Sequence, residues 1–149
     1  MTHLGRRCAA LLIALPAMIA VSAVPAVAQP VEDEGSELLL SFIAPSGNVS
    51  CMLKADYARC DIVDRDWSPP PRPADCEFDY GQGVAVSDSG PAEFVCAGDT
   101  TFGVDEVLPY GESMSTGPMR CESAEPGVTC RNGDTGRGFF LSRQSYRLF

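Results

Sequence analysis

The chain has 149 residues, the size of one ordinary domain, and 45% of them are hydrophobic, which is enough for a packed core. Its formal net charge is −9, from 20 acidic and 11 basic residues. Because phosphate binding depends on Lys and Arg, this balance argues against nucleic acid as a partner. Seven cysteines in so short a chain indicate disulfides or a metal site.

The first 28 residues are predicted to be a secretory signal peptide. Arg6 and Arg7 precede an apolar run over 8–24, and the small residues at 26–28 form a cleavage pattern. A membrane anchor is the alternative, because the apolar run approaches spanning length. Two prolines and the cleavage pattern favour removal, so we expect export to the periplasm or the medium. The remaining chain has no second stretch of membrane length, and its net charge is about −11.

Residues 29–37 are acidic and predict a short flexible lead, so the folded domain is expected over 38–149. Gly and Pro interrupt nearly every window in which a helix could form. The Pro-rich segment 67–73 predicts an extended crossing loop pinned by Trp67, a reading favoured over an SH3-type ligand. Short strands are expected at 38–43, 49–53, 57–63, 77–80, 83–87, 92–97, 101–107, 118–123, 127–132, 136–142 and 145–149. This spacing predicts an all-β fold, a small disulfide-braced sandwich or barrel of antiparallel strands with little helix after the signal peptide.

Six cysteines follow the predicted signal peptide, an even number that fits a disulfide framework in an exported domain. Spacing alone allows 15 connectivities. Eight residues separate Cys51 from Cys60, and eight separate Cys121 from Cys130, with turn-forming residues inside each segment. Each pair therefore predicts a hairpin with opposed cysteines, and Cys76 is left to pair with Cys96. A Cys₄ metal site or a redox pair is the alternative, but the chain contains no Cys-x-x-Cys.

The only histidine, His3, falls within the predicted signal peptide. Without an imidazole, Ser-His-Asp and Cys-His catalysis and His-containing zinc sites are excluded for the mature chain. Lys54 is the only lysine, and no phosphate-binding loop or dinucleotide fingerprint is present. We therefore assign no catalytic residue, no cofactor and no metal ligand.

Paired carboxylates are the main enzyme chemistry left open. On a strand, Asp75, Glu77 and Asp79 would share one face about 7 Å apart, a spacing that suits a glycan hydrolase. They could also hold Ca²⁺, although the EF-hand spacing is absent. Any solvated strand face shows the same pattern, so an exposed acidic face is the favoured interpretation.

Candidate binding residues are aromatic side chains and arginines near the end of the chain. Trp67, Tyr80 and Tyr110 are of the type that lines a sugar or peptide groove. Arg143 and Arg147 alternate onto one side of the last predicted hairpin, where guanidinium forks suit carboxylate or phosphate groups. Burial in the core and pairing with the 20 acids are the structural alternatives.

Several phrases occur together in an order that resembles a family of small exported bacterial proteins of unknown function. They are PSGNVSC (45–51), RCDI (59–62), WSPPPRP (67–73), CAGDT (96–100), LPYG (108–111), GVTCRN (127–132) and TGRGFFLSR (135–143). The resemblance spans 42–149 and implies export and a single six-cysteine domain. It implies no activity. The position of Arg137 is often His in that family, so an imidazole role there would not carry over.

Together these features predict a non-catalytic binding or envelope-associated module for a protein, peptide or glycan partner. The acidic surface favours a cationic protein or peptide. The alternatives are a carboxylate-dependent glycan hydrolase and a structural surface protein.

Overall fold

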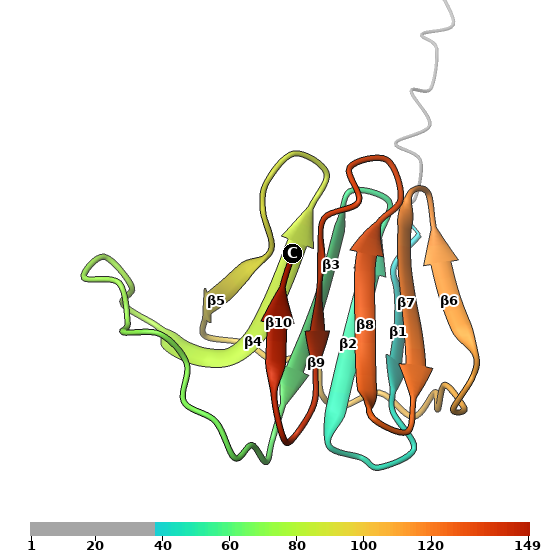
Figure 1. Ribbon diagram of the computed structural model, residues 1–149, viewed down its shortest axis with the longest axis horizontal. Helices are drawn as coiled ribbons and strands as arrows, with labels where there is room; N and C mark the ends of the chain where they lie inside the picture. The colour runs from blue at the N-terminus through green and yellow to red at the C-terminus, as the bar shows by residue number, and fades with distance from the viewer. Residues whose placement is uncertain (1–37) are drawn as a thin grey trace, which may run out of the picture. The chain divides into compact units, whose positions relative to one another are not determined.

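A computed structural model describes residues 38–149, which form ten β-strands and no helix (Figure 1). The predicted signal peptide (1–28) and acidic lead (29–37) lie outside the described residues. The strands are β1 (Leu40–Ile43), β2 (Val49–Lys54), β3 (Tyr57–Ile62), β4 (Asp79–Ser87), β5 (Glu93–Ala97), β6 (Ser113–Thr116), β7 (Met119–Ala124), β8 (Gly127–Asn132), β9 (Gly138–Leu141) and β10 (Tyr146–Leu148).

The strands form two antiparallel five-stranded sheets, and each sheet follows the chain without a crossover. The first has the order β1-β2-β3-β4-β5 and the second the order β6-β7-β8-β9-β10. Corresponding strands of the two sheets face each other: β2 contacts β7, β3 contacts β8 and β4 contacts β9. The all-β prediction is confirmed. The sheets are not closed on each other, so the fold is a sandwich and the barrel alternative is wrong.

The core fills the space between the sheets because side chains alternate along each strand. In β7, Met119, Cys121 and Ser123 point inward, and the residues between them point to the opposite face. The largest fully buried side chains include Phe42, Leu53, Ile62, Phe139 and Leu141, drawn from both sheets.

All three predicted disulfides are confirmed: Cys51–Cys60, Cys76–Cys96 and Cys121–Cys130. The first and third each join directly opposed residues of neighbouring strands, with Cα atoms 4.1 Å apart. Such close Cα atoms are typical of a non-hydrogen-bonded antiparallel pair. The Sγ atoms of Cys60 and Cys130 lie 3.4 Å apart, so the two hairpin disulfides touch at the centre of the core. Each bridge is expected to stabilise the fold by about 3 kcal/mol.

Three strand predictions differ from the structure. Residues 77–80 and 83–87 were expected as two strands, but β4 runs without a break, with a bulge between Tyr80 and Val84. Gly81 permits this because its φ is +85° and a Cβ there would clash with Pro69. The edge strand β6 was not expected, because its short polar sequence has no hydrophobic alternation. Residues 101–107 form no strand and instead belong to a crossing segment.

This crossing segment, residues 98–107, links the two sheets, and we call it the strap. It runs from the end of β5 across the outer face of the first sheet. Thr101 and Ser50 on β2 exchange two hydrogen bonds, each 2.7 Å long. The amide of Ile43 on β1 then donates to the carbonyl of Glu106. The strap therefore covers β3 and β2 and then pairs with the free edge of β1 before the chain enters the second sheet.

Candidate functional site

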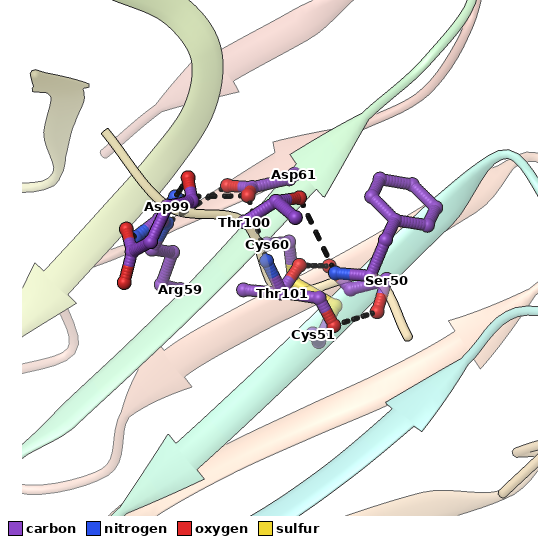
Figure 2. A network of polar contacts seen from close by, with 9 residues as sticks. Ser50, Cys51, Arg59, Cys60, Asp61, Asp99, Thr100 and Thr101 are labelled. Atoms are coloured by element: carbon purple, nitrogen blue, oxygen red, sulfur yellow. Dashed lines mark hydrogen bonds and ion pairs between the residues drawn. A yellow bond between two sulfur atoms is a disulfide. The ribbon is translucent and has the colours of Figure 1, made fainter. Parts of the chain in front are cut away.

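The strap is held by an ionic network on the outer face of the first sheet, in which Arg59 and Asp61 are buried and Asp99 is exposed (Figure 2). Arg59 of β3 is almost fully buried, and it donates to both oxygens of Asp61 at 2.8 and 2.9 Å. It also donates to the side chain of Asp99 at 2.7 Å and to its carbonyl at 2.9 Å. The amide of Thr101 donates to Asp61 at 2.9 Å. The guanidinium thus joins a strand to the strap through both carboxylates.

The electrostatics of this network favour the charged forms of Arg59 and Asp99. Burial opposes the charge on Arg59, but hydrogen bonds to Asp61 and Asp99 outweigh it and raise the pKa of the guanidinium. The hydrogen bond from Arg59 lowers the pKa of Asp99 below its ordinary value. A general acid needs a raised carboxyl pKa, so Asp99 is poorly suited to that role. The network is a structural clamp, in which one guanidinium holds two carboxylates, rather than an acid–base pair.

Gly83 of β4 leaves the space that Asp61 occupies. The two residues are direct partners across β3 and β4, and a Cβ on Gly83 would clash with Oδ1 of Asp61 and with Val95. Position 83 therefore requires glycine. The sequence did not reveal this, because the residues around Gly83 have the composition of an ordinary strand. The available signal for the network was the spacing of Arg59 and Asp61, which places an arginine and an aspartate on the same face of a predicted strand.

The five candidate binding residues fall in three separate places. Trp67 is half-buried, packs on Tyr146 with ring centroids 4.7 Å apart, and donates to the carbonyl of Ser142 at 2.8 Å. Tyr80 packs near Phe94 of the same aromatic group. The guanidinium of Arg147 lies over two phenylalanine rings on the outer face of the second sheet. Only Tyr110 and Arg143 line a common cavity.

This cavity lies where three turns meet at one end of the sandwich, the lower edge of Figure 1, and we call it the turn-end cavity. It encloses about 290 Å³. The β1–β2, β7–β8 and β9–β10 turns all contribute to it. Its chemical groups come from both sheets: Ser46, Asn48, Asp64, Tyr110, Glu125, Arg143 and Gln144.

The walls of the turn-end cavity are fixed by hydrogen bonds from the segment after β3. The Asn48 side chain accepts from the amide of Asp64 at 2.7 Å and donates to its carbonyl at 2.9 Å. Two residues on, the amide of Asp66 donates to the carbonyl of Arg143 at 2.8 Å. The indole N–H of Trp67 donates to the carbonyl of Ser142, which precedes Arg143 in the same turn. Since one segment is tied to both sheets, the cavity is formed before any ligand arrives.

The acidic residues singled out from the sequence do not form a shared strand face. Asp75 and Glu77 precede β4, and only Asp79 belongs to the strand. All three are exposed. A different pair of carboxylates, Asp64 and Glu125, lines the turn-end cavity. Sequence spacing could not find this pair, because its members are far apart in the chain.

The sulfur atoms of Cys51, Cys60 and Cys130 lie close enough together to suggest a metal site. All three belong to disulfides, however, and a disulfide sulfur lacks the thiolate that binds a metal. Within residues 38–149, this is the one cluster of Cys, His, Asp or Glu side chains with metal-binding proximity.

Fold and site together define a disulfide-braced β-sandwich with a small polar cavity at one end, lined by turns of both sheets. The chain belongs to the DUF6636 family, a family of unknown function, whose match covers residues 9–149. No curated protein and no solved structure shows a significant match. In the described part of the chain, no helix has the length and apolar character needed to cross a membrane.

Proposed function

We propose that this protein is an exported, non-catalytic binding module whose ligand occupies the turn-end cavity. The observation that carries the proposal is the meeting of Tyr110 and Arg143 in one preformed cavity built by both sheets. Three disulfides in so short a chain support an oxidising compartment.

The lining of the cavity supports a small polar ligand. Tyr110 is 42% exposed, so its ring offers an apolar surface with a hydroxyl at its edge. Arg143 is also exposed and has only a long contact of 3.4 Å with Asp66, which leaves donors free for a ligand. The enclosed volume is at the lower end of the range for ligand sites, about 300–1,000 Å³, and fits one sugar ring or one peptide side chain.

The test is a titration of the oxidised protein with mono- and disaccharides and short peptides, followed by amide chemical shifts. We expect saturable shifts at the three turns that line the cavity. Tyr110→Ala and Arg143→Gln should each weaken binding at least fivefold. Phe78→Ala, which removes an exposed aromatic ring outside the cavity, is the matched control and should leave affinity unchanged. Shifts spread over the whole surface, or equal losses in all three variants, would contradict the proposal.

A carboxylate-dependent glycan hydrolase is the second candidate, because Asp64 and Glu125 line the same cavity. Glycoside hydrolysis is commonly carried out by a pair of carboxylates. Release of reducing ends from glycans by the unaltered protein, abolished in Glu125→Gln while binding persists, would favour this candidate over the binding module. Binding without any release would favour the module.

A further inference from the structure

Among residues 38–149, no segment buries the three arginines on the outer face of the second sheet, and we call this outer face the arginine face. Alternation along β7, β8 and β9 sends Cys121, Cys130 and Phe139 into the core and their neighbours outward. The outward residues of β7, β8 and β9 are Arg120, Glu122, Thr129, Arg131 and Phe140. Arg147 of β10 and Phe149 after it lie beside β9 on the same face. A hollow on this face is lined by Arg120, Glu122, Thr129 and Arg131.

The strand register brings like charges together. Arg120 of β7 lies directly opposite Arg131 of β8, on strands about 4.8 Å apart. Like charges in direct cross-strand pairs destabilise a sheet. Arg147 lies opposite Phe140, on the far side of β9. The three cations therefore form a band across the sheet, held there by backbone pairing and not by attraction among the side chains.

Acidic side chains neutralise this band only weakly. Of the acidic residues in 38–149, only Glu122 lies on the arginine face, and its oxygen is 3.9 Å from Arg120 with both side chains about half exposed. Neither Arg131 nor Arg147 has an ion pair with any residue of 38–149. Arg147 instead lies over the rings of Phe140 and Phe149, at 5.7 and 5.8 Å. The guanidinium groups keep hydrogen-bond donors available for an external anion.

The location of these arginines contrasts with the charge of the rest of the chain. Residues 38–107 hold twelve acidic and four basic residues, whereas 108–149 hold four acidic and five basic residues. An acidic protein that keeps three arginines and one acidic residue on one face has a local charge opposite to its net charge. That arrangement attracts a slender anion that reaches only this face.

We propose that the arginine face binds a carboxylate-bearing polysaccharide. Guanidinium forks match carboxylates in geometry as well as charge. The hydroxyl of Thr129 and the rings of Phe140 and Phe149 lie along the same band and supply a polar and an apolar contact for sugar rings. The chain of sugars would lie across the strands, with its acidic groups over the three arginines.

The net charge of the protein favours such a glycan over other anions. A nucleic acid or an anionic membrane has dense negative charge that also meets the acidic first half, and repulsion there opposes binding. A folded acidic protein needs an apolar centre in its contact surface, whereas the centre of this face is charged. An acidic glycan is thin and carries less charge per length, so it interacts with the arginine face alone.

The experiment is calorimetric titration of the full oxidised chain with oligogalacturonate, at low and at physiological salt. The ligand control is the same oligosaccharide as its methyl ester, which removes the charge and keeps the sugar backbone. The variant is Arg120→Gln/Arg131→Gln. Its matched control is Arg65→Gln/Arg137→Gln, which has the same net charge and removes two arginines outside this face.

We expect binding to oligogalacturonate and none to the ester. The Kd should rise at least tenfold in Arg120→Gln/Arg131→Gln and less than twofold in the control, with unchanged melting of both. Equal weakening of the two double variants, or no binding at all, overturns the proposal. Arginine-dependent binding of polyglutamate or phosphatidylglycerol vesicles in place of the glycan also overturns it. Tyr110→Ala should leave this binding intact, since Tyr110 lies in the turn-end cavity.

Discussion

The outer faces of the two sheets each carry arginine, but they place it in opposite environments, buried and paired on one sheet and exposed on the other. On the first sheet, Arg59 is covered by the strap and bonded to two carboxylates. On the second, Arg131 is exposed and has no carboxylate partner among residues 38–149. Both sheets are five-stranded meanders with a disulfide between their second and third strands, so the fold does not impose this difference. The connecting segment does, because it crosses only one of the two faces.

The difference indicates which face contributes stability and which is available for recognition. A covered charge must be fully paired, since an unpaired buried charge is costly. An exposed charge is screened by water and contributes little to folding. The covered face therefore needs its arginine for the fold, and the open face can hold arginines for another purpose. Substitutions on the two faces should separate these roles.

The largest effect is expected from Arg59→Met, which leaves the buried carboxylate of Asp61 without its cation. The free energy of unfolding should fall by about 3–5 kcal/mol, because breaking one member of a buried ion pair strands the other. Denaturant unfolding with the disulfides intact measures it. Adding Asp61→Asn to this variant should recover part of the loss. A loss below 1 kcal/mol would show that the clamp is unimportant for the covered face.

Gly83→Ala should have the next largest effect. The new Cβ would clash with the Asp61 carboxylate and displace the clamp without changing any charge. Overpacking of this kind costs about 1–3 kcal/mol. Gly133→Ala is the control, since a Cβ there meets its nearest atom at 3.4 Å, an ordinary contact. Thermal melting of both variants would reveal whether the clamp tolerates displacement.

The contribution of Asp99 should depend on pH. Its pKa is lowered by Arg59 from the ordinary value of 3.8, so its charge stabilises the folded state above the unfolded pKa. That contribution is complete above about pH 5 and disappears as the pH falls through the lowered folded pKa. Because the Asp99 side chain is 79% exposed, the difference between the protein and Asp99→Asn should be below about 1 kcal/mol at pH 7. Unfolding curves from pH 7 to pH 2 measure it, and a difference that grows on acidification would contradict the assignment.

The smallest effect is expected on the open face. Arg131→Gln removes a like charge opposite Arg120 and no ion pair, so stability should be unchanged or rise by up to about 0.5 kcal/mol. The same unfolding assay compares it directly with Arg59→Met. A loss above 1 kcal/mol in Arg131→Gln would remove the distinction between the two faces.

Much of the fold was predictable from local sequence. Alternation and turn residues identified most strands, and the equal eight-residue spacings identified the two hairpin disulfides, which left one pairing for Cys76 and Cys96. The errors fell where local sequence is ambiguous. Residues 101–107 have strand-like composition, but their hydrogen bonds go to an outer sheet face, and β6 pairs only because β7 lies beside it.

The candidate site was predictable only in part. Tyr110 and Arg143 were identified by residue type, whereas Glu125 and Asn48 were not, because both occur in turn sequences whose composition indicates only a turn. Residue type alone does not distinguish a ligand contact from a core aromatic, and the ring of Trp67 is half-buried against Tyr146.

The sequence by itself determined the strand content, the disulfide pairing and the absence of imidazole beyond His3, because these depend on composition and on contacts between near neighbours. Only the tertiary structure decided which charges are buried, which arginines lack partners and which turns share a cavity. Those properties arise when segments distant in sequence meet. The strap crosses one sheet only, so the arginine beneath it is buried and paired whereas the arginines of the other sheet are exposed.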